Sequence, residues 1–253
     1  MSPMTLRTEP SARWVRAYAG DAPIVDSRRS LLFWEERFPV PACAIPEEDV
    51  RLDLLTHSAA PERWHPFFGP HGPVSAVWDL RIGDLFIPAV AWRRDDPALA
   101  GHVVLTWLPG TLHWTEEDEP VFGHPRDPHK RVDALPSSRH VVVSLDGTVL
   151  AETNRPVTLF ETGLPTRYYF PPEDVRFDEL TAVEHVTGCP YKGIADRYWS
   201  RPGLDNFAWS YREPTPAVGR IKDRVAFYNE LVDITVDGVL EPRPQSPFST
   251  DRP

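Results

Sequence analysis

Residues 140–151, HVVVSLDGTVLA, decide the fold class of this chain. Two runs rich in valine and leucine flank Asp146-Gly147, and an Asp-Gly pair between such runs is typical of a tight β-hairpin. Further segments of β-forming residues lie at 155–161, 166–170, 225–228 and 232–236. The 29 prolines of the chain would interrupt long helices repeatedly. The sequence therefore predicts a mainly β protein with little helix.

The chain contains the same pattern twice. The aligned segments are residues 13–39 with 139–165, residues 46–56 with 171–181, and Ala91-Trp92 with Ala208-Trp209. A repeat of this length is a whole domain rather than a short solenoid unit. We therefore expect two tandem, pseudo-twofold related small β domains, which would make the chain a monomer with an internal pseudo-dimer.

The alignment also divides the chain into four parts. We expect a degenerate first copy at residues 10–118, a linker at 119–138, a second copy with the intact motif at 139–241, and a flexible tail at 242–253. The linker is placed there because residues 123–130 are polar and proline-rich.

Composition limits the classes of partner. The chain has 27 basic and 37 acidic residues and a net charge of −10, which disfavours a nucleic-acid backbone as partner. No apolar run reaches the roughly 18 residues of a membrane span, and the first 20 residues do not resemble a signal peptide. The two cysteines, Cys43 and Cys189, provide neither a disulfide framework nor a metal site. We expect a cytoplasmic protein with a small-molecule ligand and no metal or cofactor.

The two copies differ where functional groups are most concentrated. Residues 187–200 of the second copy include Cys189 and Lys192. If Trp92 is aligned with Trp209, the facing stretch of the first copy is residues 72–79, which has no cysteine, tyrosine or lysine. A fold needs its core in both copies, whereas a site can be kept in one. The comparison therefore predicts a site in the second copy only.

Three residues are candidates for chemistry. Lys192 can serve as a base, a Schiff-base former or an anion clamp, or it can be an ordinary exposed lysine. Cys189 can be a thiolate nucleophile beside that cation, or a small core residue. Glu161 can act as acid or base, or it can have a structural role in a pair with Arg155.

A second group of side chains can bind a ligand. Aromatic and cationic groups of this kind line pockets for planar or anionic molecules, and they equally fill the core of a small β domain. The group consists of Arg167, Tyr168, Tyr169, Tyr191, Trp209 and Tyr211. Three functions remain open: a small-molecule enzyme centred on Lys192 and Glu161, a non-catalytic binding module that uses the same pocket, and a structural or interaction protein.

Several motifs of the second copy resemble a known family. Residues 159–171, 173–175, 189–195 and 208–211 are similar to the domain of unknown function 427 family, which is also labelled a nucleotidyltransferase and often occurs in tandem in actinobacteria. The resemblance implies a compact β fold. The sequence contains neither a strand–turn with paired aspartates for two metal ions nor a glycine-rich phosphate cradle, so the residues give the nucleotidyltransferase label no support.

Overall fold

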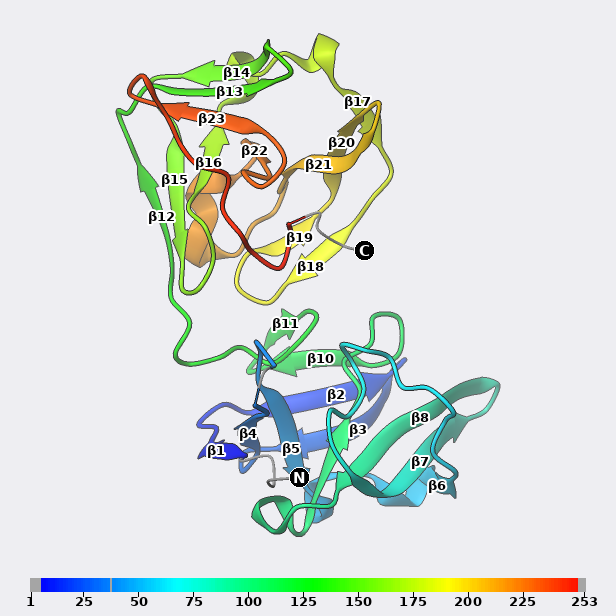
Figure 1. Cartoon of the computed structure of the whole chain (residues 1–253). Coiled ribbons are helices and arrows are strands. Elements are labelled where there is room, and N and C mark those ends of the chain that lie inside the picture. The colour runs from blue at the N-terminus through cyan, green and yellow to red at the C-terminus, as the bar shows by residue number, and fades with distance from the viewer. Residues whose placement is uncertain (1–5, 37, 250–253) are drawn as a thin grey trace. The chain divides into compact units, whose positions relative to one another are not determined.

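The computed structural model describes residues 6–36 and 38–249, which divide into two compact units (Figure 1). The first unit ends at Asp127 and the second begins at Pro128. Strands dominate both units. In the described residues the only helices are 3-10 helices of three to six residues. The prediction of a mainly β chain with little helix is confirmed.

The first unit contains two antiparallel sheets. The seven-stranded sheet has the order β1 (Arg7–Pro10), β4 (Leu31–Trp34), β5 (Ala42–Pro46), β9 (His102–Leu105), β8 (Leu85–Arg94), β7 (Val74–Ile82) and β6 (Leu55–Ser58). The four-stranded sheet has the order β11 (Glu119–Val121), β10 (His113–Glu116), β2 (Val15–Ala19) and β3 (Ala22–Ser27). Its helices are η1 (Glu47–Asp49), η2 (Leu52–Leu54) and η3 (Pro97–Leu99).

The second unit repeats these two sheets and adds a small one. The seven-stranded sheet has the order β12 (Val132–Pro136), β15 (Val157–Glu161), β16 (Arg167–Phe170), β22 (Val225–Phe227), β21 (Leu204–Ser210), β20 (Arg197–Arg201) and β17 (Thr181–Val183). The four-stranded sheet has the order β14 (Thr148–Thr153), β13 (Val141–Leu145), β23 (Asp233–Val236) and β24 (Val239–Leu240). The hairpin of β18 (Thr187–Cys189) and β19 (Gly193–Ala195) and the helices η4 (Pro172–Asp174), η5 (Phe177–Glu179) and η6 (Pro216–Ile221) complete the unit.

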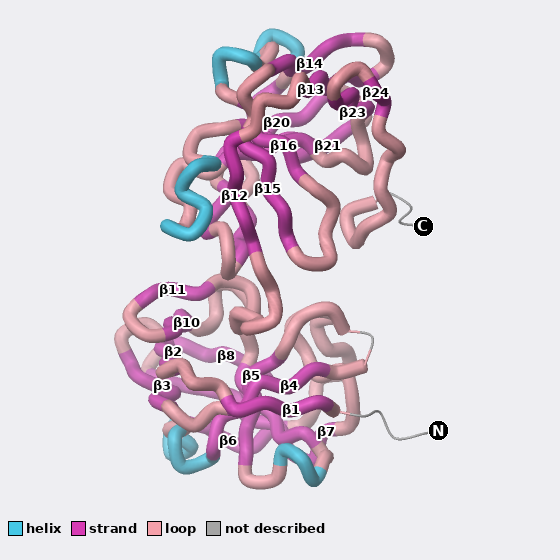
Figure 2. The backbone as a smooth tube through the Cα atoms, turned by 90° about the vertical axis from the view of Figure 1, so that its left-hand side faces the viewer, coloured by secondary structure: helices cyan, strands magenta, loops and turns pink. Residues whose placement is uncertain are grey.

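The two units share one topology, strand for strand, in both large sheets. Figure 2 shows the short helices at the edges of these strand layers. Local contacts repeat as well: Arg29 pairs with Glu48 at 2.6 Å, and Arg155 pairs with Glu173 at 2.6 Å. The tandem duplication inferred from the sequence is therefore present in the structure.

The large sheet of the second unit separates two cores. One face packs against the four-stranded sheet and buries Tyr168 and Phe170. The other face buries Tyr169 and Trp209 together with residues of η6. Adjacent residues of β16 thus point into different cores because side chains alternate along a strand. This alternation decides which of the aromatic candidates can belong to one site.

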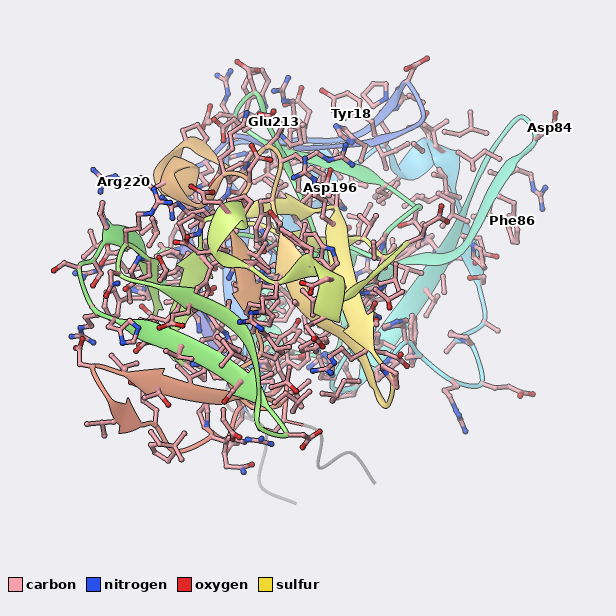
Figure 3. All side chains as sticks on the ribbon, turned by 90° about the horizontal axis from the view of Figure 1, so that it is seen from above. Tyr18, Asp84, Phe86, Asp196, Glu213 and Arg220 are labelled. Atoms are coloured by element: carbon pink, nitrogen blue, oxygen red, sulfur yellow. The ribbon has the colours of Figure 1, made fainter. Side chains whose placement is uncertain are left out.

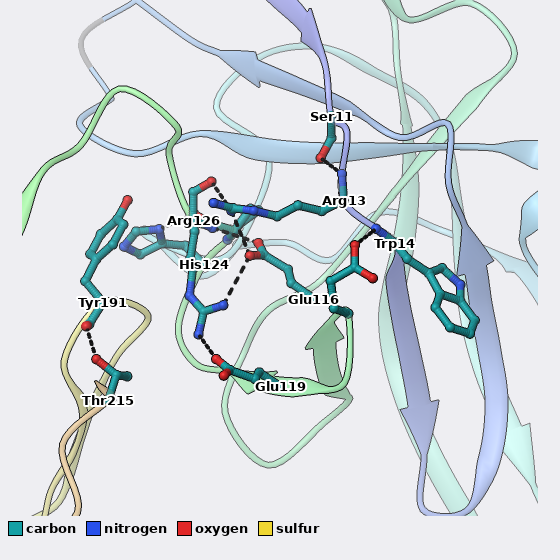
Figure 4. A network of polar contacts seen from close by, with 11 residues as sticks. Ser11, Arg13, Trp14, Glu116, Glu119, His124, Arg126, Tyr191 and Thr215 are labelled. Atoms are coloured by element: carbon teal, nitrogen blue, oxygen red, sulfur yellow. Dashed lines mark hydrogen bonds and ion pairs between the residues drawn. The ribbon is translucent and has the colours of Figure 1, made fainter. Parts of the chain in front are cut away.

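Residues 119–138, which we expected to form a linker, contain β11 and β12 and are paired within the two units. Arg126 of this segment is bound to Glu116, which lies just before it. Glu116 accepts a hydrogen bond from Arg13 Nη1 at 2.7 Å and another from the backbone N–H of Arg126 at 2.9 Å (Figure 4). Burial raises the pKa of Glu116, although these partners act against that shift.

The expected tail is also partly packed against the second unit. Ser246 Oγ donates to Glu230, and the ring of Phe248 lies 5.4 Å from that of Tyr228. A segment with such contacts is held by the fold, and its proline and serine content gave no sign of this. Residues 250–253 of the expected tail lie outside the described residues.

Candidate functional site

The structure brings Glu161 and Lys192 into direct contact as an ion pair. Glu161 ends β15, and Lys192 lies in the turn between β18 and β19. Their side chains are only 8% and 13% exposed, so the pair lies largely out of solvent. Arg155, the alternative partner of Glu161, pairs instead with Glu173 and Asp174. The structural pairing expected for Glu161 is therefore wrong.

Lys192 is held in its protonated form. Burial lowers the pKa of its ammonium group, but nearby Cys189, Glu161 and Tyr169 together raise it, and the net shift is upward. A lysine that keeps its proton is a poor base and a poor amine nucleophile. Of the three roles considered for Lys192, this environment favours the anion clamp.

Three buried tyrosines surround the pair. Burial raises the pKa of Tyr169, Tyr198 and Tyr211, that of Tyr198 to about 12, so all three hydroxyls carry their protons at neutral pH. Tyr169 Oη accepts a hydrogen bond from Trp209 Nε1 at 3.3 Å. Tyr198 Oη shares one of 2.5 Å with Thr187 Oγ1. The cluster therefore offers hydroxyl donors beside a carboxylate and an ammonium group.

Cys189 belongs to the same cluster. It ends β18 opposite Gly193 of β19 and is half-buried. Its sulfur interacts electrostatically with Lys192 and with Tyr169, Tyr198 and Tyr211. The structure thus groups all three residues expected to carry chemistry.

The turn that carries Lys192 is fixed by its backbone. Thr215 N–H donates to the Lys192 carbonyl at 3.1 Å, and Thr215 Oγ1 donates to the Tyr191 carbonyl at 2.6 Å (Figure 4). Gly193 has φ +95°, and a Cβ there would lie 3.1 Å from the Glu213 carbonyl oxygen. Only glycine adopts this conformation without strain. The backbone contacts of Tyr191, Lys192 and Gly193 thus fix the position of Lys192.

Two of the expected ligand-binding residues have other contacts. Arg167 makes a bidentate pair with Glu230 at 2.6 and 2.7 Å, and both residues are buried. Tyr168 lies in the core on the opposite face of the sheet, where its hydroxyl donates to Glu241 at 3.0 Å. The sequence pattern could not separate Tyr168 from Tyr169, since only the register of β16 decides which face each occupies.

A model of the domain of unknown function family DUF427 matches residues 7–107 and 133–238. The chain belongs to this family. It carries two copies of the domain, as the sequence resemblance and the repeat indicated. A comparison with functionally curated proteins gave no significant match.

The first DUF427 copy keeps the buried glutamate but pairs it with a different cation. Glu35 lies 2.6 Å from Arg94 Nη2, and the two side chains are 5% and 3% exposed. Arg94 follows Trp92 by two positions, as Tyr211 follows Trp209. The prediction that only the second copy retains a chemical site therefore overlooked a charged pair in the first copy.

The cause of this oversight is a difference in hairpin length. Trp78 pairs with Ala91, 13 positions away, whereas Trp199 pairs with Ala208, nine positions away. The longer β7–β8 hairpin extends from the first unit, with Asp84 and Phe86 near its tip (Figure 3).

Because the β7–β8 hairpin is longer than its counterpart, the residues that precede it align differently with those of the second copy. Counting back seven residues from Trp199 reaches Lys192, and the same count from Trp78 reaches His71. Residues 72–79 are therefore not the counterpart of the Cys-Pro-Tyr-Lys segment. Sequence reasoning also missed Tyr198, which strand pairing aligns with Val77 of the first copy.

The described residues contain neither a membrane-spanning helix nor a cluster of metal ligands. No helix in them has the length and apolar composition needed to cross a lipid bilayer. Within residues 6–36 and 38–249, no group of three or more histidine, cysteine, aspartate or glutamate side chains is arranged to hold a metal ion.

Proposed function

We propose that the second half of this protein is a small-molecule enzyme that transfers a proton on a carbonyl compound, with Glu161 as the base and Lys192 as the group that stabilises negative charge. The observation that carries this proposal is the direct contact of a buried carboxylate and an ammonium group. An acid–base pair within hydrogen-bond reach is the arrangement that general acid–base catalysis requires. A simple binding pocket does not need both charges.

The proposed step is balanced without an added oxidant or reductant. Glu161 accepts the proton from the carbon next to the substrate carbonyl, and the electron pair of that C–H bond moves to form an enolate. Lys192 and a tyrosine hydroxyl donate hydrogen bonds to the enolate oxygen, where the negative charge collects. Glu161 then returns the proton to the same carbon, which restores the carbonyl compound.

A surface hollow lies beside β15. Glu161 lines a shallow hollow at the protein surface, together with Arg131, Asp133, Phe160 and Thr162. Phe160 is 41% exposed and precedes Glu161 in β15, so side-chain alternation directs it to the opposite face of the strand from the carboxylate.

A ligand screen tests the proposal. Keto acids, aldehydes, amides, sugar phosphates and nucleotides would be added to the wild type, Glu161→Gln and Lys192→Met, with the exposed Lys222→Met as control. Binding to the native state raises the melting temperature by mass action. We expect a carbonyl compound to stabilise the wild type and Lys222→Met, and to stabilise neither site variant.

Two results contradict the proposal. The first is a screen in which no carbonyl compound stabilises the wild type. The second is a compound that stabilises Glu161→Gln and Lys192→Met as much as it stabilises the wild type, which would place its site elsewhere. Stabilisation lost only in Lys192→Met, with no turnover in the wild type, would support the non-catalytic binding module.

A further inference from the structure

The first half contains a cavity of about 50 Å³, which the proposed chemistry of the second half does not use. Its lining residues include Glu35, Phe68, His71, Trp92 and Arg94. By strand register and position along the chain, these five residues correspond to Glu161, Cys189, Lys192, Trp209 and Tyr211. The cavity of the first half therefore lies at the position of the Glu161 cluster.

Part of the cavity lies where the second half has a large buried side chain. In the second half, Leu159 pairs with Arg167 across the sheet, and the matching pair of the first half is Phe33 with Ala42. Both Phe33 and Ala42 line the cavity. Alanine is much the smaller side chain, so its presence in place of arginine leaves space at this point.

The partners of Arg167 are replaced as well. Arg167 Nη1 donates to Asn229 at 3.0 Å and to Glu230 at 2.6 Å. By the register of β22 and β9, the first half has Trp107 and Leu108 at these two positions. A buried cation and its two polar partners are thus replaced by alanine, tryptophan and leucine. The same place is polar in the second half and apolar in the first.

The second half also shows a kind of group that packs at this place. The ring of Phe248 lies 5.4 Å from that of Tyr228 and 5.9 Å from the guanidinium carbon of Arg167. A ring supplied by the chain itself therefore lies against the residue that corresponds to Ala42. This arrangement favours an aromatic ring as the occupant of the open place in the first half.

The lining of the cavity suits such a ring. It includes six phenylalanine and tryptophan side chains: Phe33, Phe38, Phe67, Phe68, Trp92 and Trp107. The ring of Phe67 lies 5.2 Å from that of Phe38 and 5.0 Å from that of Phe68. Aromatic rings attract one another at such distances in tilted and edge-to-face arrangements. A ligand ring would make the same contacts.

The charged residues of the lining limit the charge of the ligand. Arg94 Nη2 contacts Glu35 at 2.6 Å, and Arg94 Nη1 donates to the Pro73 carbonyl at 2.6 Å. The two buried charges compensate each other. A third charge brought in by a ligand would lose its hydration without gaining a counter-ion from this pair. An uncharged ligand avoids this cost.

From these observations we infer that the first half binds a small, uncharged aromatic molecule in this cavity. The volume is below the roughly 150 Å³ of an apolar cavity that encloses a whole benzene molecule. Part of the ligand therefore stays at the surface, beside the partly exposed ring of Phe67. The site is separate from the proposed enzyme site in the second half, and neither depends on the other.

Four small molecules form a matched set of probes. Benzyl alcohol carries an uncharged aromatic ring, cyclohexylmethanol replaces that ring by a saturated one, and benzoate and benzylamine add a negative or a positive charge. Each would be titrated at neutral pH into the full-length protein, and amide chemical shifts would be followed by NMR. We expect saturable binding of benzyl alcohol at millimolar concentration, with shifts centred on the cavity residues, and much weaker binding of the other three.

Two variants locate the site. Phe67→Ala removes one lining ring and should weaken benzyl alcohol binding by about 2–10-fold. Phe86→Ala is its control, because Phe67 and Phe86 are 37% and 45% exposed and Phe86 does not line the cavity.

Ala42→Leu extends a lining side chain into the cavity and should weaken binding by about 10-fold or more. Its control is Ala98→Leu at an exposed position outside the lining. The spectrum of each variant shows whether it is folded, and the exposed Phe67 keeps the test valid if Ala42→Leu fails to fold.

Three outcomes overturn the inference. The first is the absence of saturable benzyl alcohol shifts at the cavity residues. The second is binding of cyclohexylmethanol, benzoate or benzylamine as tight as that of benzyl alcohol. The third is an affinity for benzyl alcohol that is the same in the wild type, Phe67→Ala and folded Ala42→Leu. Each of these leaves the enzyme proposal for Glu161 and Lys192 unaffected.

Discussion

Glu230→Ala is expected to lower the free energy of unfolding of the second unit by about 3–5 kcal/mol. The side chains of Glu230 and Arg167 are 0% and 7% exposed, and they share two hydrogen bonds of 2.6 and 2.7 Å. Removing the carboxylate leaves the guanidinium group buried without its counter-ion. An uncompensated buried charge is strongly destabilising.

Native-state amide hydrogen exchange is the suitable measurement, because two units need not unfold in one transition. Glu213→Ala is the control: Glu213 forms an exposed pair with Lys222 at 2.9 Å, and its loss should cost about 0–1 kcal/mol. Equal and small effects of the two variants would show that Arg167 is not held by Glu230.

The same pair predicts acid sensitivity. Burial raises the pKa of Glu230, but hydrogen bonds from Arg167 and Ser246 outweigh it, so that the pKa lies below its ordinary value. A carboxyl group whose pKa is lowered on folding stabilises the native state above its unfolded pKa. This stability is lost as the pH falls through the folded pKa. Glu230→Ala should therefore show a weaker loss of stability on acidification than the wild type.

Lys192→Met is expected to destabilise the second unit by a similar amount, about 3–5 kcal/mol, because Glu161 would stay buried without its counter-ion. The double variant Glu161→Gln/Lys192→Met removes both charges and should recover most of this loss. The coupling between the two substitutions can be read from a double-mutant cycle on hydrogen-exchange stabilities.

The double variant distinguishes a functional pair from a structural one. If it is nearly as stable as the wild type, the fold does not need the two charges, and their retention calls for another explanation such as catalysis. If it is as unstable as Lys192→Met alone, the charges themselves support the fold. That result would favour the structural interpretation of Glu161 and Lys192.

Local sequence patterns were sufficient to predict the mainly β fold and its duplication. The Asp-Gly turn at Asp146-Gly147 and the repeat of residues 13–39 are encoded by neighbouring residues, and both predicted the strand content and the duplication correctly. Residues 119–138 were expected to be a solvated linker because they are polar and rich in proline, whereas they contain β11 and β12, and the backbone N–H of Arg126 binds Glu116.

The candidate site was only partly predictable. Loss of lysine from one copy pointed to Lys192, and Glu161 was considered as an acid or base or as a structural residue. Their contact joins residues 31 positions apart and depends on the fold. The site of the first copy was missed for a different reason. When Trp92 is aligned with Trp209 without a gap, Ser75 faces Lys192. The strand pairing of the longer β7–β8 hairpin shows that His71 corresponds to Lys192 instead.

The central claim is that Glu161 moves a proton on a carbonyl compound bound at Lys192. The most direct test is to incubate the protein in D₂O with the carbonyl compounds that stabilise it, and to follow deuterium incorporation next to the carbonyl by NMR. We predict incorporation with the wild type and a rate lower by roughly 100- to 10,000-fold with Glu161→Gln. Equal rates for the two proteins, or no incorporation above the buffer rate for the wild type, would contradict the account.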